Sequence, residues 1–269
     1  MTEPILPRKK LHGKVAIVTG AASGIGEVTA RHFADHGALA VVIADVQDAK
    51  GREVAASIGS DRCTYIHCDV TDEEQVKSLV DSTVQLYGRL DVMFSNAGIG
   101  PASAQTVLEL DLSGFDKVMA VNARGMAACV KYAARAMVEK GVRGSIVCTA
   151  SFLADCGAEG QTDYTMSKHA VLGLVRCASM QLAARGVRVN CVSPALVATP
   201  LVSNSLKVGA EELRAMVEAV YPGSTGPLTE KHVADAVVFL ASEDSEFISG
   251  HNLVVDGGRG MNVIAALKP

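Results

Sequence analysis

The sequence predicts an α/β fold, in which one Rossmann-like domain holds a doubly wound, parallel, seven-stranded sheet with helices on both faces. Three observations lead to this prediction. Short runs of apolar and β-branched residues recur along the chain, segments with helical periodicity separate them, and a glycine-rich turn follows the first run. Runs that are apolar throughout are typical of strands buried on both faces, which favours a parallel sheet with right-handed crossovers.

In the first half of the chain, apolar runs that are expected to be strands alternate regularly with segments of helical periodicity. KVAIVTG (14–20) is the first expected strand, and the helical stripe of IGEVTARHFADHG follows it, with Gly37 as the expected C-terminal cap. AVVIAD (40–45) and CTYIHCDV (63–70) are expected strands on either side of the helix AKGREVAASIG. The next helix is expected to begin with a capping box, because Thr71 precedes Glu74 by three residues.

The second half continues the pattern to the last strand. LDVMFSNAG (90–98), GSIVCTAS (144–151), VRVNCVSP (187–194) and HNLVVDGG (251–258) are the remaining expected strands. Long helices are expected over about 113–140 and 163–185, and a further helix over 230–241. A looser region separates the sixth strand from that last helix. Without a linker or an internal repeat, the prediction is a tail at 1–11 and one domain at 12–269.

Composition excludes several classes of function. The 269 residues are 49% hydrophobic with a net charge of −4, which lacks the basic character of nucleic-acid binding. The longest apolar runs are too short to span a bilayer, and residues 1–14 do not have the pattern of a secretory signal. We therefore expect a cytoplasmic protein without nucleic-acid or membrane partners. Seven cysteines, several in apolar runs (Cys129, Cys148, Cys177 and Cys191), favour buried reduced thiols, and no spacing indicates a metal site.

The turn TGAASGIG after the first strand predicts a dinucleotide site. Gly20, Gly24 and Gly26 would allow a tight turn and a close approach of the backbone to a pyrophosphate at the helix N-terminus. An ordinary turn is the alternative. Asp45, at the end of the second strand, would bind the adenosine ribose and repel a 2′-phosphate, so NAD is expected rather than NADP. For Asp45 the alternative is a solvated acid at a strand end.

Two further strand ends carry candidate residues, and one helix carries a polar pair. Asp69 follows the third strand, and the uncharged turn around Asn96 follows the fourth; either could be purely structural. Tyr164 and Lys168 are four residues apart in the expected helix, so both would lie on one face, one turn apart. On its own this pair could be a surface accident.

The motifs together resemble the short-chain dehydrogenase/reductase family over about residues 12–258. The matching motifs are TGAASGIG, Asp45, CDVT (68–71), SNAG (95–98), Asn122 in AVNARG, Ser151, YTMSK (164–168), NCVSP (190–194) and VDGG (255–258). Two positions depart from the family pattern: Ser95 replaces an Asn, and Ala195 replaces a Gly, where it could tighten the backbone near the nicotinamide.

The resemblance implies roles for individual residues and a homotetramer. Tyr164 would be the acid/base, Lys168 would hold the nicotinamide ribose, Ser151 would bond the reacting oxygen, and Asn122 would anchor a water. The implied NAD-binding residues are Gly20, Ser23, Gly24, Ile25, Gly26, Asp45, Val46, Cys68, Asp69, Val70, Asn96, Ala97, Gly98, Tyr164, Lys168, Val197 and Thr199. A phenol with a pKa near 10 needs a depression of about two to three units to act as a base, which Lys168 and oxidised nicotinamide would supply.

The expected substrate site is mostly apolar. Its cover would be the segment at about 198–228, and its walls would include Ile99, Phe152, Leu153, Leu201 and Met216. Alternatively, these residues merely pack the loops together. The sequence also resembles plant dehydrogenases of the isopiperitenol, borneol and nepetalactol types, which implies NAD-linked oxidation of a hydrophobic monoterpene secondary alcohol or lactol. A non-redox cyclase or isomerase that retains NAD, and a redox-silent NAD-binding module, are the alternatives.

Overall fold

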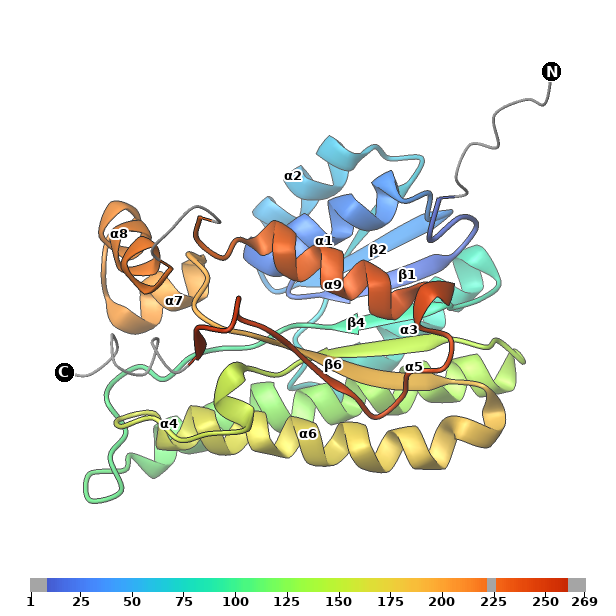
Figure 1. The fold of residues 1–269 in the computed structure, drawn as a ribbon. Coiled ribbons are helices and arrows are strands. Elements are labelled where there is room, and N and C mark those ends of the chain that lie inside the picture. Colours follow the sequence, from blue (N-terminus) through green and yellow to red (C-terminus); the bar gives the residue numbers. More distant parts are fainter. Residues whose placement is uncertain (1–8, 222–225, 261–269) are drawn as a thin grey trace.

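The computed structural model describes residues 9–221 and 226–260, and its strands form one parallel sheet (Figure 1). The strand order is β3-β2-β1-β4-β5-β6-β7, with parallel pairing throughout. The bounds are β1 (Val15–Thr19), β2 (Ala40–Asp45), β3 (Cys63–His67), β4 (Val92–Ser95), β5 (Ser145–Thr149), β6 (Arg188–Pro194) and β7 (Asn252–Val255). The predicted fold class is confirmed, although several strands are shorter than expected because their polar ends belong to the turns.

Helices cover both faces of the sheet, and each face has its own apolar core (Figure 1). On one face lie α1 (Gly24–Asp35), α2 (Asp48–Ile58) and α9 (Glu230–Ala241), and on the other α3 (Glu73–Tyr87), α5 (Met126–Glu139) and α6 (Thr162–Leu182). Strand residues alternate between the two cores, as Ala16 and Val18 face one and Ile17 the other. This explains why β1 is apolar at every position up to Thr19.

The helix expected over 113–140 is interrupted. It consists of α4 (Leu112–Met119), a π-helical segment η1 (Ala120–Gly125), and then α5. Wider π turns inside α-helices occur frequently at functional sites. Here the wider turn holds the buried Asn122. Apolar periodicity cannot reveal such an interruption, because the apolar stripe continues through it.

The region expected to be looser contains two helices at the carboxyl end of the sheet. They are α7 (Pro200–Leu206), which starts with proline at its first position, and α8 (Ala210–Val220) (Figure 1). Leu213, Val217 and Val220 bury the inner face of α8 in the first core. The expected cover at 198–228 is thus largely helical, and its residues 222–225 lie outside the described part. Short 3-10 turns follow β5 at η2 (Phe152–Ala154), α6 at η3 (Ala183–Arg185), and α9 at η4 (Glu243–Ser245).

Three local expectations were wrong. The N-cap of α3 is Asp72, which accepts from the backbone N–H groups of Glu74 and Gln75, so Thr71 makes no capping box. The domain includes residue 11, because Leu11 is fully buried and its N–H donates to the carbonyl of His36; the rest of the expected tail up to residue 8 lies outside the described residues. Cys177 was expected to be a buried thiol, but it is exposed on α6. The seven cysteines form no disulfide with one another.

Candidate active site

A cavity of about 770 Å³ opens at the carboxyl end of the sheet, between the strand ends and α7. Gly20 after β1, Asp45 at the end of β2 and Asn96 after β4 all line it. In the strand order, β1 connects outward to β2 while β4 connects toward β5, so the chain leaves in opposite directions at this point. Open parallel sheets bind ligands at such a switch point.

The glycine turn after β1 is a close crossing of backbones. Gly20 and Gly24 adopt positive φ angles of 65° and 57°, which favour glycine. A Cβ on Gly26 would lie 2.2 Å from the carbonyl oxygen of Gly20. Gly20 and Gly24 line the cavity, whereas Gly26 does not. Gly26 was expected to contact the cofactor directly, but it acts by letting α1 pack against the turn.

The Asp45 carboxylate lies between two turns and is 8% exposed. One oxygen accepts from the N–H of Ala22 at 3.0 Å, and the other from the N–H of Gln47 at 2.9 Å. Lys50 also lines the cavity, with its ammonium 2.9 Å from the side-chain oxygen of Gln47. A cation therefore lies in the same cavity as Asp45, which the position of Asp45 in the sequence does not indicate.

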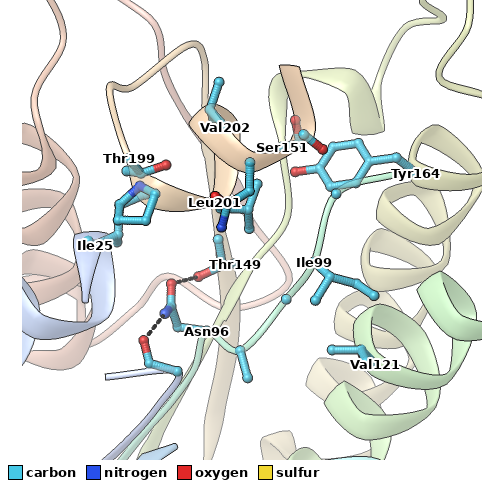
Figure 2. Close-up of a pocket in the computed structure, with 18 of the residues that line it drawn as sticks. Ile25, Asn96, Ile99, Val121, Thr149, Ser151, Tyr164, Thr199, Leu201 and Val202 are labelled. Carbon is cyan, nitrogen blue, oxygen red and sulfur yellow. Dashed lines mark hydrogen bonds between the residues drawn. The ribbon is translucent and has the colours of Figure 1, made fainter. Parts of the chain in front are cut away.

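Asn96 ties three strand ends together (Figure 2). Its amide N–H groups donate to the carbonyls of Thr19 and Gly20 at 3.1 and 3.2 Å, and its side-chain oxygen accepts from the Thr149 hydroxyl at 3.0 Å. Its side chain is therefore engaged within the protein. What Asn96 offers to the cavity is a rigid floor between β1, β4 and β5, together with the adjoining backbone of Ala97 and Gly98.

Asp69 is similarly engaged, since its carboxylate accepts from the N–H and the hydroxyl of Thr71 at 2.9 and 2.8 Å. It lines the cavity beside Cys68 and Val70. These hydrogen bonds within the protein fix the conformation of the turn after β3, and the turn forms one wall of the cavity.

Ser151, Tyr164 and Lys168 come together on one side of the cavity. Figure 2 shows the hydroxyl of Ser151 facing that of Tyr164, one from the end of β5 and the other from α6. The Lys168 ammonium lies 5.5 Å from the centre of the Tyr164 ring and donates to the carbonyl of Thr149 at 2.9 Å. The arrangement places two hydroxyls where they can both contact one substrate oxygen, with a cation behind them.

Burial acts on both titratable groups of this set. It raises the pKa of Tyr164 to about 12, although the neighbouring Ser151 hydroxyl lowers it through hydrogen bonding. Burial also lowers the pKa of Lys168 to about 8. Desolvation is the largest cause of the raised pKa of Tyr164, and the depression expected with oxidised nicotinamide bound stays a prediction.

Asn122 does not line the cavity, although the sequence placed it among the catalytic residues. Its amide clamps the backbone of Ile99, donating to the Ile99 carbonyl at 2.9 Å and accepting from the Ile99 N–H at 2.8 Å. It also donates to the Ser167 hydroxyl at 3.1 Å. Its side chain is committed to these groups and supports the loop after β4, and the expected role of Asn122 in anchoring a water stays a prediction.

Apolar side chains dominate the remaining wall. Ile99, Phe152, Leu153 and Leu201 line the cavity as expected. Val121 and Val202 also line it, and Figure 2 shows them with Ile99 and Leu201. Met216 does not, because it lies on α8, away from the cavity. The predicted cofactor residues that do line it are Gly20, Ser23, Gly24, Ile25, Asp45, Val46, Cys68, Asp69, Val70, Asn96, Ala97, Gly98, Tyr164, Lys168, Val197 and Thr199.

Sequence reasoning missed several polar lining residues, among them Gln47, Lys50, Thr149 and Gln161. Gln161 precedes Tyr164 by three residues, so the helical spacing already used for Lys168 could have found it. Thr149 carries no such signal. Over residues 9–221 and 226–260, there is no group of three His, Cys, Asp or Glu residues that could hold a metal ion, and no helix long and apolar enough to cross a membrane.

Comparison with known proteins agrees with this geometry. The family described as Enoyl-(Acyl carrier protein) reductase matches residues 20–259. The chain is 59% identical to the (-)-isopiperitenol/(-)-carveol dehydrogenase, mitochondrial, of Mentha piperita, over 93% of this chain and 94% of that one. It is 60% identical to the (+)-cis,trans-nepetalactol synthase NEPS2 of Nepeta racemosa, over 93% and 95%.

A solved structure shares the fold. The 3-ketoacyl-(acyl-carrier-protein) reductase from Brucella melitensis, complexed with NADH, superposes with a TM-score of 0.82 at 31% identity, covering 93% of this chain and 99% of that one. The parallel seven-stranded fold of this chain is therefore shared with a solved oxidoreductase. The chain belongs to the short-chain dehydrogenase/reductase family, and its relatives include plant monoterpenoid enzymes.

Proposed function

We propose that the protein is an NAD-dependent dehydrogenase that interconverts a hydrophobic secondary alcohol, a plant monoterpenol, and its ketone. The observation that carries this proposal is the placement of Ser151, Tyr164 and Lys168 in one cavity beside a mostly apolar wall. The name of the peppermint relative, an isopiperitenol and carveol dehydrogenase, supports the same substrate class.

The residues at the cofactor end suit a dinucleotide. Gly20 and Gly24 leave the turn after β1 without side chains, and the buried Asp45 carboxylate can accept hydrogen bonds from a ribose. Lys168 would bind the second ribose. When bound, oxidised NAD supplies the hydride acceptor and a positive charge that favours the phenolate.

The chain's own residues then handle the proton. The Ser151 hydroxyl donates to the alcohol oxygen and orients it, while the Tyr164 phenolate accepts the alcohol proton as the carbon gives up its hydride. The nearby Lys168 ammonium stabilises the phenolate. In the reverse direction Tyr164 returns the proton to the carbonyl oxygen.

The apolar wall sets the expected substrate size. Burial of about 250 Å² of ligand surface at about 25 cal/mol per Å² gives about 6 kcal/mol before ordering costs, enough for micromolar to millimolar use. Among the described lining residues the only cations are Lys50 and Lys168. With Lys168 at the reacting centre and Lys50 beside Asp45, no pair of cations converges on a substrate carboxylate or phosphate.

The test is a panel of terpenols, sugars and hydroxy acids with NAD, followed by absorbance of the reduced nicotinamide and chiral analysis of products. Terpenol oxidation faster than all other classes supports the proposal. Faster turnover of a sugar or a charged hydroxy acid would refute the substrate class.

A non-redox cyclase or isomerase that retains NAD is the second candidate. It is favoured by relatives at 57–60% identity that are named nepetalactol synthases. A cyclase would convert a reactive terpenoid precursor without any change in nicotinamide absorbance, whereas the dehydrogenase would form one reduced nicotinamide per product.

Two further expectations remain proposals. Helices α5 and α6 would form subunit contacts in a homotetramer, in keeping with the exposed Met166 and Met180 on α6. The protein would reside in the cytoplasm, although the peppermint relative is named as mitochondrial. A fluorescent fusion in plant cells tests the location.

A further inference from the structure

Three polar side chains form one stripe along α6, and only two of them have a role so far. Gln161 is the residue before the helix, and Tyr164 and Lys168 follow it by three and seven positions. Residues at this spacing share one helix face, and all three line the cavity. Lys168 lies toward the cofactor end, Tyr164 at the reacting centre, and Gln161 therefore on the substrate side of it.

The backbone around Gln161 is held on both sides by a single buried residue, Gln105. The N–H of Gln105 donates to the carbonyl of Gly160 at 2.8 Å, and its carbonyl accepts from the N–H and the hydroxyl of Thr162 at 3.2 and 2.6 Å. Gln105 is 2% exposed, and its own side chain accepts from the N–H of Asp111 at 3.0 Å. The position of Gln161 is thus as firmly fixed as that of the catalytic tyrosine.

The Gln161 side chain itself is uncommitted. It is half-buried, and its amide makes no hydrogen bond to any of the described residues. The other polar groups on this side are either engaged or exposed: the Ser205 hydroxyl donates to the carbonyl of Pro101 at 2.9 Å, and Asn204 is exposed on α7. A fixed amide with free donors and a free acceptor in a mostly apolar wall is suited to bind a polar ligand atom.

We infer that Gln161 is a specificity-determining residue that binds a second, uncharged oxygen of the substrate. This inference rests on the proposed function and deepens it, because the apolar wall alone would recognise only one hydroxyl. Side chains three apart on a helix have Cβ atoms about 5–6 Å apart, so the Gln161 amide is within reach of a small substrate held at the Tyr164 hydroxyl. A second oxygen on the far part of a ring-bearing substrate suits this placement. An uncharged amide in a mostly apolar wall favours a hydroxyl, carbonyl or ring oxygen over a carboxylate, because it does not offset the cost of burying a charge.

Carveol and sobrerol are a matched pair of probes. Both carry the same allylic secondary alcohol on a cyclohexene ring. Sobrerol has water added to the isopropenyl double bond of carveol, which places a tertiary hydroxyl on the substituent two ring carbons away from the secondary alcohol. The variant Gln161→Met keeps the length of the side chain but removes the amide. Gln161→Glu keeps an acceptor for the added hydroxyl. The control is Gln181→Met, because Gln181 is exposed on the same helix and does not line the cavity.

The kcat/KM ratio of sobrerol to carveol should fall about tenfold in Gln161→Met, mostly through KM, since one part-exposed hydrogen bond contributes about 0.5–1.5 kcal/mol. Gln161→Glu should retain most of the ratio, and Gln181→Met all of it. An unchanged ratio in Gln161→Met, in protein whose unfolding temperature matches the wild type, overturns the inference.

Calorimetric binding of both alcohols to the protein with NADH separates this inference from the proposed function. If the wild type binds sobrerol more tightly than carveol and Gln161→Met does not, the inference stands even when neither alcohol is oxidised; the proposed redox function then fails alone. If the wild type binds both alcohols equally, or neither, the inference fails whatever the rate of oxidation.

Discussion

We expect this protein to prefer NAD over NADP, and substitution of Asp45 by Asn should largely abolish that preference. In the wild type, the carboxylate is 8% exposed and held by the N–H groups of Ala22 and Gln47, so it cannot turn away from a 2′-phosphate. Asparagine keeps the shape and removes the charge. Because one of its two terminal atoms is a donor that would face a backbone N–H, the variant should also unfold at a temperature lower by about 2–4 °C.

The size of the preference follows from the charges. Two negative charges about 4 Å apart repel by about 4 kcal/mol at an effective dielectric constant of about 20. Lys50 lines the same cavity and offsets part of this repulsion. We therefore expect about half the repulsion to remain, or about 2 kcal/mol, which is about a thirtyfold difference in Kd. In Asp45→Asn the difference should shrink to about threefold.

The assay is fluorescence titration of NADH and NADPH, which requires no knowledge of the substrate. Lys50→Met is the matched control, because loss of the cation should weaken NADPH binding further and widen the preference. Equal affinities for the two cofactors in the wild type would refute the placement of Asp45 at the ribose. A preference that Asp45→Asn leaves intact would refute the electrostatic argument.

Four other predictions concern chemistry, packing, pH and assembly. Tyr164→Phe removes only the hydroxyl, so turnover should fall by about three orders of magnitude while NADH affinity changes little; a variant that keeps a tenth of the wild-type rate would mean that another group moves the proton. Gly26→Ala places a Cβ 2.2 Å from the Gly20 carbonyl oxygen, so it should weaken NADH binding at least about tenfold and lower the unfolding temperature. In the control Gly157→Ala, no atom lies within 4 Å of the new Cβ, so both quantities should stay unchanged when they are measured by calorimetry. Burial lowers the pKa of Lys168 in the folded protein to about 8, from 10.5, so burying its charge lowers the stability below pH 8, and this loss of stability is relieved as the pH rises to 10.5. Lys168→Met should therefore unfold at a higher temperature than the wild type at pH 7. A difference in unfolding temperature that does not narrow between pH 8 and pH 10.5 would contradict this. Light scattering at micromolar concentration should give the mass of a tetramer, and a monomer would refute the assembly proposed for α5 and α6.

The sequence by itself determined the fold class and the cofactor end of the site. Apolar runs buried on both faces specify a parallel sheet, and the glycines between β1 and α1 specify the turn at its carboxyl edge. These features are local, because burial pattern and backbone freedom are encoded in neighbouring residues. Tyr164 and Lys168 also belong here, since a helix brings residues four apart together wherever it packs.

Only the tertiary structure decided what the polar side chains contact. Asn122 binds the backbone of Ile99, 23 residues away, and Asn96 binds the carbonyls at the end of β1, 76 and 77 residues away. Lys50 and Gln161 face the cavity because α2 and α6 pack on opposite faces of the sheet and yet both extend to its carboxyl edge. Burial raises the pKa of Tyr164, and the motif does not reveal this, because desolvation depends on everything packed around the ring. No local pattern contains this information, since each of these contacts exists only once distant segments have been brought to the same edge of the sheet.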